Sequence, residues 1–314
     1  MNRINKEYKS IDERINILKS RGLLFKNETA AYNILLKHSY FDIINANEKL
    51  FADMSFSEKH YLPNIYFEDL YDIYLFNNEL SELTMNILLS VEATLKNSLS
   101  YRFCGRYCTS IFNTEEYINP NNFVRPQQRA LLQKWNRFWP FSNHRDYIAS
   151  LKRKYNYMDV YDKLPFWVAI KGIDFGTTAQ YIRFLDRTTK AEVKNDLGFQ
   201  NFSENTFEHA IYILKEMRNS CAHGEMIYRF SRSPNSSTFN YHLTAQELGL
   251  SRTSVNYMDI IKILKLLVSK KEIQKVKRCI IRFYIKYVFK RKTWMVKKIL
   301  GKMGNQNIKK WIKL

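Results

Sequence analysis

The stretch FEDLYDIYLFNNELSELTMNILLSVEATLKNSLSYRF, residues 67–103, decides the fold. It contains neither proline nor glycine, so nothing in it forces a break. In its second half Leu88, Val91, Leu95 and Leu99 recur at the spacing that lines one face of a helix. The pattern predicts one or two long helices.

The rest of the 314 residues fits an all-α fold. The chain is 45% hydrophobic and 15% aromatic, which excludes global disorder, and its 9 glycines and 6 prolines are few. We expect an N-terminal helical region over residues 1–60 and a helical domain over 61–250. A segment is inserted near 104–160, and a helical extension follows over 251–314.

Positive charge is concentrated in that extension. The net charge is +20, and residues 262–314 hold 18 Lys or Arg against one acid, Glu272. A basic block of this kind typically binds phosphate groups, either in nucleic acid or on an anionic membrane surface. We favour RNA, and the candidate RNA-binding residues are Lys290, Arg291, Lys292, Lys297, Lys298 and Lys302.

Other classes of protein are disfavoured. No apolar run approaches the roughly 18 residues of a membrane span, so we expect no membrane partner. Residues 1–20 are charged and polar, unlike a signal peptide, which predicts a cytoplasmic protein with reduced thiols. Cys104 and Cys108 lack a second pair at zinc spacing, so we expect no metal and no cofactor.

A second stretch, ILKEMRNSCAHGEMIYRF at residues 213–230, carries the candidate chemistry. On a helical wheel Arg218 falls about 20° from Phe207, inside the apolar stripe. A guanidinium on a buried seam is costly unless it is paired or faces a site. His223 would point about 140° away from Arg218 on an ideal helix. Either the helix ends near Gly224 and His223 turns, or two copies of the segment share one site.

An arginine and a histidine suffice for RNA cleavage without a metal. An imidazole changes its charge close to neutral pH and can move a proton at the 2′-hydroxyl or the leaving oxygen. A guanidinium stabilises the charge on the pentavalent phosphorus. Asn219 could orient the phosphate or His223. The alternative for each is structural: an ion pair for Arg218, a helix cap for His223, and a helix-end hydrogen bond for Asn219.

One further contact is predicted from the wheels. Glu92 falls about 40° from Leu88, inside the apolar face of the first stretch. Because Glu92 and Arg218 each place one charge of opposite sign in an apolar stripe, we expect the carboxylate to orient the guanidinium. Lys96, one turn beyond Glu92, is a candidate phosphate ligand, although a solvated lysine is the simpler interpretation.

The sequence resembles a known family over roughly residues 6–230. RNSCAH, residues 218–223, is similar to the RxxxxH motif of the HEPN superfamily of helical ribonucleases. LPFWVAIKGIDFGTTAQYIRFL, from Leu164, resembles the LP-x-W … FG segment of the Abi-like (abortive infection, AbiD/AbiF-type) bacterial proteins. The segments LKSRGLLFKNETAAYNILLKHSYFDIINA and YLFNNELSELTMNILLSVEATLKNSLSYRF are similar to that family's first half.

The resemblance implies a HEPN-type helical bundle that forms a homodimer, with RxxxxH motifs from two protomers facing one cleft. It implies a metal-independent endoribonuclease that acts as a toxin in antiviral defence by abortive infection. Some AbiF-type relatives pair with a small non-coding RNA, which makes a dedicated RNA a second expected partner. The alternative function is a non-catalytic RNA-binding protein that holds a structured RNA through its basic surface.

Overall fold

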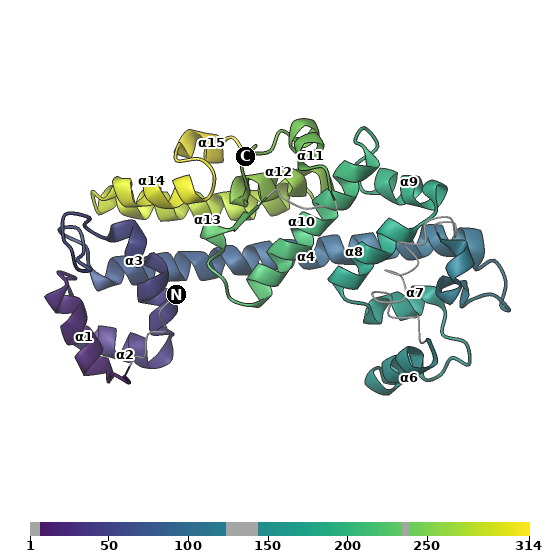
Figure 1. The fold of residues 1–314 in the computed structure, drawn as a ribbon, viewed down its shortest axis with the longest axis horizontal. Helices are drawn as coiled ribbons and strands as arrows, with labels where there is room; N and C mark the ends of the chain where they lie inside the picture. The colour runs from purple at the N-terminus through teal and green to yellow at the C-terminus, as the bar shows by residue number, and fades with distance from the viewer. Residues whose placement is uncertain (1–6, 124–143, 234–238) are drawn as a thin grey trace.

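The computed structural model describes residues 7–123, 144–233 and 239–314, and it confirms an all-α protein (Figure 1). The α-helices are α1 (Ile11–Ser20), α2 (Glu28–Lys37), α3 (Ala46–Phe51), α4 (Phe67–Tyr107), α6 (His144–Lys154), α7 (Phe166–Ala169), α8 (Phe175–Phe184), α9 (Arg187–Asp196), α10 (Glu204–Ala222), α11 (Tyr241–Leu248), α12 (Tyr257–Leu267), α13 (Lys270–Phe289), α14 (Thr293–Lys302) and α15 (Ile308–Ile312). In the described ranges the only strands are β1 (Ser231–Arg232) and β2 (Val255–Asn256), which pair antiparallel. No described helix is long and apolar enough to cross a membrane.

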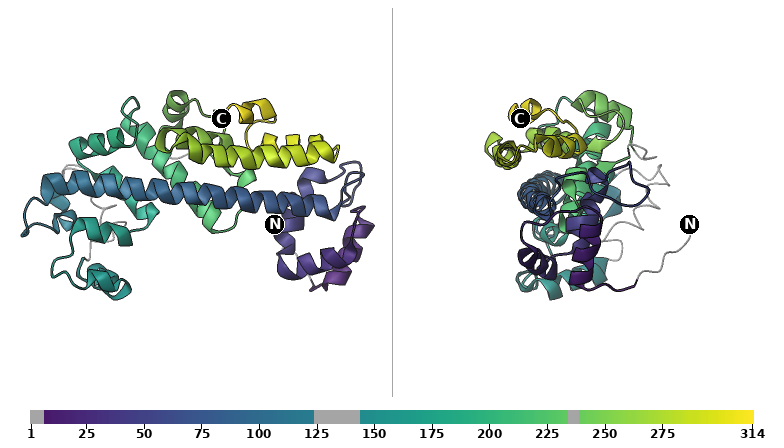
Figure 2. Two further views of the ribbon diagram at one scale, coloured as in Figure 1. Left: turned by 180° about the vertical axis from the view of Figure 1, so that it is seen from behind. Right: turned by 90° about the vertical axis from the view of Figure 1, so that its left-hand side faces the viewer.

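One helix, α4, is the axis of the molecule. The predicted long helix is a single one of 41 residues, about 60 Å at 1.5 Å per residue. Helices α1–α3 cluster at one end of α4, α6–α9 lie at the other, and α10 crosses its middle (Figures 1 and 2). Because these groups cover different parts of α4, its buried residues occur along its whole length, from Phe67 to Phe103.

The helix ends follow local sequence signals. Ser10 and Glu13 form a capping box on α1, and Gly22 follows with φ +81°. The next helical stretch is interrupted, because α2 ends at Lys37 and a short π-helix (Phe41–Asn45) leads into α3. At the far end, the ring of Phe103 packs against Phe166 and Tyr181. Part of the expected insertion near 104–160 lies outside the described residues.

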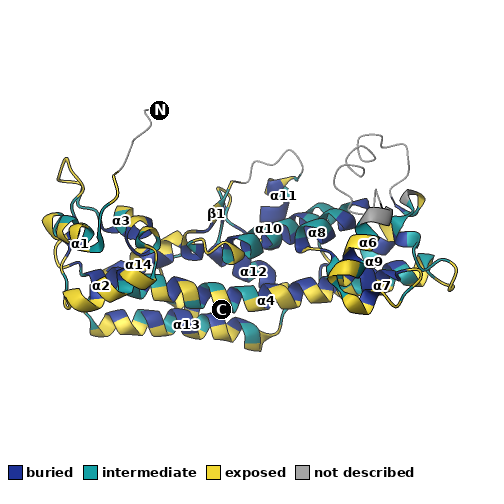
Figure 3. Ribbon diagram, turned by 90° about the horizontal axis from the view of Figure 1, so that it is seen from below, coloured by how far each residue is buried: buried dark blue, intermediate teal, exposed yellow. Residues whose placement is uncertain are grey.

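The C-terminal helices lie along α4. Figure 3 shows α13 beside α4 with buried and exposed residues alternating along it. The ring of Phe283 stacks on Phe76 at 4.1 Å, and the Tyr287 hydroxyl donates to the carbonyl of Asp69 at 3.1 Å. The last sixth of the chain therefore covers one side of the axis helix.

Ion pairs fasten this contact. Lys290 lies 3.0 Å from a carboxylate oxygen of Asp69 and 2.6 Å from one of Asp72, and Lys292 also donates to Asp69. Asp69 is buried, and burial alone would raise the pKa of its carboxyl. Hydrogen bonds from Lys292 and Lys290 outweigh burial, so the pKa of Asp69 lies below its usual value.

The lowered pKa of Asp69 makes the packing of α13 pH-dependent. Its ion pairs stabilise the fold above the unfolded-state value, about pH 4, and are lost as pH falls toward the lower folded value. We expect Asp69→Asn to cost about 1–3 kcal/mol at neutral pH, because Lys290 keeps Asp72 while Lys292 loses its carboxylate and keeps only the carbonyl of Asn64. Urea unfolding from pH 7 to pH 3 measures this, and the difference between the variant and wild type should shrink below about pH 4.

Glu82→Gln is the matched control. Glu82 is exposed on the same helix and forms no ion pair among the described residues. A stability difference for Asp69→Asn that stays constant across the whole pH range would contradict this assignment.

Candidate functional site

The candidate site lies at the C-terminal end of α10. The helix ends at Ala222, and the His223 N–H still donates to the Asn219 carbonyl at 2.9 Å. Gly224 has φ +67°, and the Glu225 N–H donates to the Ser220 carbonyl at 3.0 Å, which closes a left-handed helix cap. The helix therefore ends near Gly224, as the first of the two arrangements requires, and a site shared by two copies stays a prediction. The cap leaves the side chain of His223 exposed.

Buried amides hold the turn that follows. Asn77 of α4 donates to the Glu225 carbonyl and accepts from the Tyr228 N–H, each at 3.4 Å. The Tyr228 hydroxyl donates to Asn47 at 2.6 Å, and Asn47 donates to the carbonyl of Ile43 at 2.9 Å. This chain of contacts ties the end of α10 to α4 and to the N-terminal helices. We did not predict it, although an Asn inside the apolar pattern of residues 67–103 was a signal.

Arg218 has few partners inside the protein. Its Nη1 lies 3.5 Å from the Asn219 side-chain oxygen, at the limit of a hydrogen bond. Its Nε is buried without a hydrogen-bond partner, and no carboxylate of the described residues forms an ion pair with it. A buried, unpaired donor on a charged group is costly and calls for an explanation. Arg218, Asn219 and His223 thus lie within six residues at the end of α10, and no carboxylate of the described residues neutralises the cation of Arg218.

The expected contact between Glu92 and Arg218 is wrong. Glu92 pairs instead with Lys96 at 2.6 Å, within its own helix. The alignment of the two helices explains this, since the thiol of Cys221 contacts the side chain of Ser81. Glu92 lies 11 residues beyond Ser81, about 16 Å along α4, whereas Arg218 lies only about 4.5 Å from Cys221 along α10. Lys96, a candidate phosphate ligand, is engaged with Glu92.

A second cation, Arg232, lies beside the turn that ends α10, and the sequence did not predict it. Arg232 of β1 donates to the Ser220 hydroxyl at 2.9 Å and to the Glu225 carboxylate at 3.2 Å. Ser220 also donates to Glu225 at 2.7 Å. Hydrogen bonds from Ser220 and then Arg232, with the charge of His223, hold the pKa of Glu225 below its ordinary value. This acid is therefore held as an anion by neighbours other than Arg218.

The candidate RNA-binding residues fall into two groups. Lys290 and Lys292 are occupied by Asp69 and Asp72, as described above. Arg291, Lys297, Lys298 and Lys302 are exposed, the last three on α14. Helix α14 packs against the short 3₁₀ helix Ile227–Arg229, which begins four residues after His223. These exposed lysines thus belong to a helix that packs against the segment after the candidate site.

No set of three or more His, Cys, Asp or Glu residues gathers into a candidate metal site in the part of the chain that the structure describes.

Comparison with known proteins gives one match. The model of the Abi-like protein family matches residues 33–229, nearly two thirds of the chain, and the match includes Arg218, Asn219 and His223. No curated protein and no solved structure matches the chain.

The pairing of Glu92 with Lys96 gives a testable energy. Both side chains are mostly buried, at 10% and 13% exposure. Glu92→Gln should destabilise the protein by about 1–2 kcal/mol, because it leaves the ammonium of Lys96 without its carboxylate. Lys96→Met in the same chain should recover part of this loss, with a coupling energy of at least about 0.5 kcal/mol in urea unfolding. Strictly additive effects would show that the pair contributes nothing.

Proposed function

The chain belongs to the Abi-like protein family, and from this premise we propose that it is a metal-independent endoribonuclease of the HEPN type. Membership itself points to abortive infection, in which an infected cell is shut down before the virus spreads. The finer proposal is that the shutdown proceeds by cleavage of RNA at Arg218, Asn219 and His223.

One observation carries the proposal. The guanidinium of Arg218 has a buried donor without a partner, and it lies five residues before an exposed histidine at the end of the same helix. A phosphate group would supply the missing acceptor and the missing negative charge together. The neighbouring acid does not compete for this role, because Glu225 is held by Ser220 and Arg232.

The chemistry requires no further cofactor. The 2′-hydroxyl of the RNA attacks the adjacent phosphorus, and the bond from phosphorus to the 5′-oxygen breaks. A base takes the 2′ proton and an acid returns a proton to the leaving oxygen, which yields a 2′,3′-cyclic phosphate and a 5′-hydroxyl. Histidine can perform both transfers. Arg218 stabilises the charge on the equatorial oxygens, and Asn219 orients the phosphate.

A homodimer would supply two histidines to one cleft. Leu75 and Leu89 are large apolar residues exposed on α4, at 43% and 45%. They flank the part of α4 that meets the end of α10 at Asn77 and Ser81. Contact between two copies at this face of α4 would cover both leucines.

The lysines of α14 support an RNA partner. Lys297, Lys298 and Lys302 are exposed on α14, which packs against the 3₁₀ helix that follows the turn after His223. A strand bound at the site would therefore continue over a surface that attracts its backbone. The same surface would hold a dedicated non-coding RNA, and a cytoplasmic location agrees with both ligands.

Cleavage in the presence of EDTA tests the proposal. We expect His223→Ala to reduce the rate by about 10²–10⁴-fold and Arg218→Lys by about 10²-fold or more, while RNA binding by His223→Ala persists. His242→Ala, which changes an exposed histidine on α11, is the matched control. Full activity in both site variants would contradict the assignment. If the wild-type protein binds RNA and never cleaves it, the non-catalytic RNA-binding alternative is correct.

Salt dependence tests the role of α14. Replacing Lys297, Lys298 and Lys302 together by Gln should weaken RNA binding and lower the slope of log affinity against log salt by about 2. The control replaces three exposed lysines near the N-terminus, Lys19, Lys37 and Lys49, and should leave the slope unchanged. Equal slopes in all three proteins would exclude α14 from the interface.

A further inference from the structure

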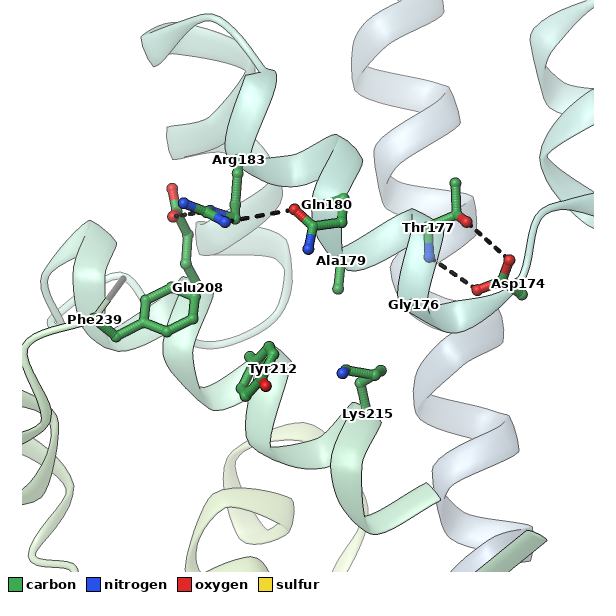
Figure 4. Close-up of a pocket in the computed structure, with 10 residues that line it drawn as sticks. All are labelled: Asp174, Gly176, Thr177, Ala179, Gln180, Arg183, Glu208, Tyr212, Lys215 and Phe239. Carbon is green, nitrogen blue, oxygen red and sulfur yellow. Dashed lines mark hydrogen bonds and ion pairs between the residues drawn. The ribbon is translucent and has the colours of Figure 1, made fainter. Parts of the chain in front are cut away.

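A cavity of about 330 Å³ lies between α8 and α10 (Figure 4). Its size falls in the range of small-ligand sites, about 300–1,000 Å³. In Figure 4 the side chains of Gln180, Tyr212 and Lys215 point into the space between the two helices. Arg183, Glu208 and Phe239 close one end of the cavity, and Asp174 stands at the other.

The acids of the lining are already engaged. Asp174 caps α8 by accepting from the N–H of Thr177 at 2.9 Å and from its hydroxyl at 2.8 Å. Glu208 lies 2.7 Å from the Lys190 ammonium and 3.7 Å from the Arg183 guanidinium. Both carboxylates keep their partners when a ligand enters the cavity. The lining therefore does not exclude a ligand that carries negative charge.

The remaining groups suit a flat, polar ring. The Gln180 side-chain oxygen lies 3.4 Å from Arg183, which turns its NH₂ group toward the cavity. Tyr212 offers a ring face, over which the Lys215 ammonium lies at 4.2 Å while it also pairs with Glu216. An amide that donates and accepts, an aromatic face and a cation together match a nucleobase with its phosphate.

The cavity lies on the same face of α10 as Asn219, between the directions of Arg218 and His223. Measured from Lys215 on a helical wheel, Asn219 lies about 40° away and Ala222 about 20° away, while Arg218 and His223 lie about 60° and 80° to opposite sides. The axial distance from Lys215 to Ala222 is about 10 Å. A single strand that runs along this face would pass from the cavity directly to the turn.

We propose that the cavity receives one nucleobase of the RNA strand whose neighbouring phosphate is held at Arg218 and His223, and that it sets the base preference of cleavage. Gln180 bonds to the edge of the base. Lys215 leaves Glu216 and the Tyr212 ring to contact the phosphate between the cavity and the turn, so that Tyr212 can stack on the base. This inference rests on the proposed function, and it adds a residue-level source of specificity that lies outside the RxxxxH motif.

The test uses a pool of RNA with random sequence around a single-stranded region and maps cleavage ends by sequencing. We expect the wild-type protein to prefer certain bases at one position next to the cleaved bond. Gln180→Leu keeps the size of the side chain and removes its hydrogen bonds, so the preference at that position should fall at least about tenfold. Gln274→Leu, an exposed position on α13, is the matched control and should keep the wild-type profile.

An unchanged profile in Gln180→Leu would overturn the proposal. Tyr212→Phe, which retains the ring, should preserve the preference, and Tyr212→Ala should weaken binding. A loss of stacking is worth about 1–3 kcal/mol, or roughly 5–150-fold in affinity. Thermal unfolding of each variant separates a lost contact from a lost fold.

Binding without cleavage keeps this inference distinct from the proposed nuclease activity. RNA that carries 4-thiouridine is irradiated with the full-length His223→Ala protein, and a crosslink at Tyr212 or Phe239 supports the cavity even if wild-type protein never cleaves. Absence of any crosslink in the cavity overturns it even if cleavage is observed. Competition by free mononucleotides at concentrations equal to the oligonucleotide would instead identify a soluble nucleotide as the ligand and would refute the role in strand recognition.

Discussion

The fold depends on covering the apolar side chains of one long helix, α4. Isolated helices gain little from their own hydrogen bonds, and most helical stability in proteins comes from packing. Helix α4 has 41 residues and buries side chains along its whole length. The N-terminal helices, α9, α10 and α13 each cover a different part of it. The positions of these helices relative to one another are therefore set by where each of them packs along α4.

The candidate site inherits its geometry from this arrangement. Asn77 projects from α4 and holds the backbone on the far side of the turn after His223. Because the left-handed Gly224 stands between them, the histidine is exposed while the residues that follow it return to the core. Helix α4 and the helix end at Gly224 together place the imidazole of His223 at the surface, directly at the end of a helix.

Much of this fold could be predicted from the sequence, and the site only in part. The long helix, the capping box at Ser10 and the helix end at Gly224 are each specified by a short stretch of sequence. Such local preferences usually agree with the final fold. The pairing of Glu92 was predicted wrongly, because a wheel shows which way a side chain points but not how far two helices have slid past each other. The contacts of Arg232 and the cavity at Gln180 bring together residues from separate segments of the chain. No periodicity in the sequence predicts such long-range contacts.

Charge in the sequence also differs from charge at the surface. The C-terminal block looks uniformly basic, yet Lys290 and Lys292 are neutralised by acids more than 200 residues away, while the lysines of α14 are exposed. Composition alone therefore overstates the basic surface. The distinction matters because ion pairs inside the protein contribute to stability, whereas unpaired lysines remain available for a phosphate backbone.

The pairing of Asp69 with lysines 221 and 223 residues later has a consequence for biosynthesis. At roughly 5–20 residues per second, a ribosome needs about 10–45 s to make the intervening chain. During that interval α4 waits with an uncovered apolar side and an unpaired acid, because the helix that covers it has not been translated. The final assembly is therefore delayed until nearly the whole polypeptide has left the ribosome, so a nascent chain lacks the compact form of the finished protein.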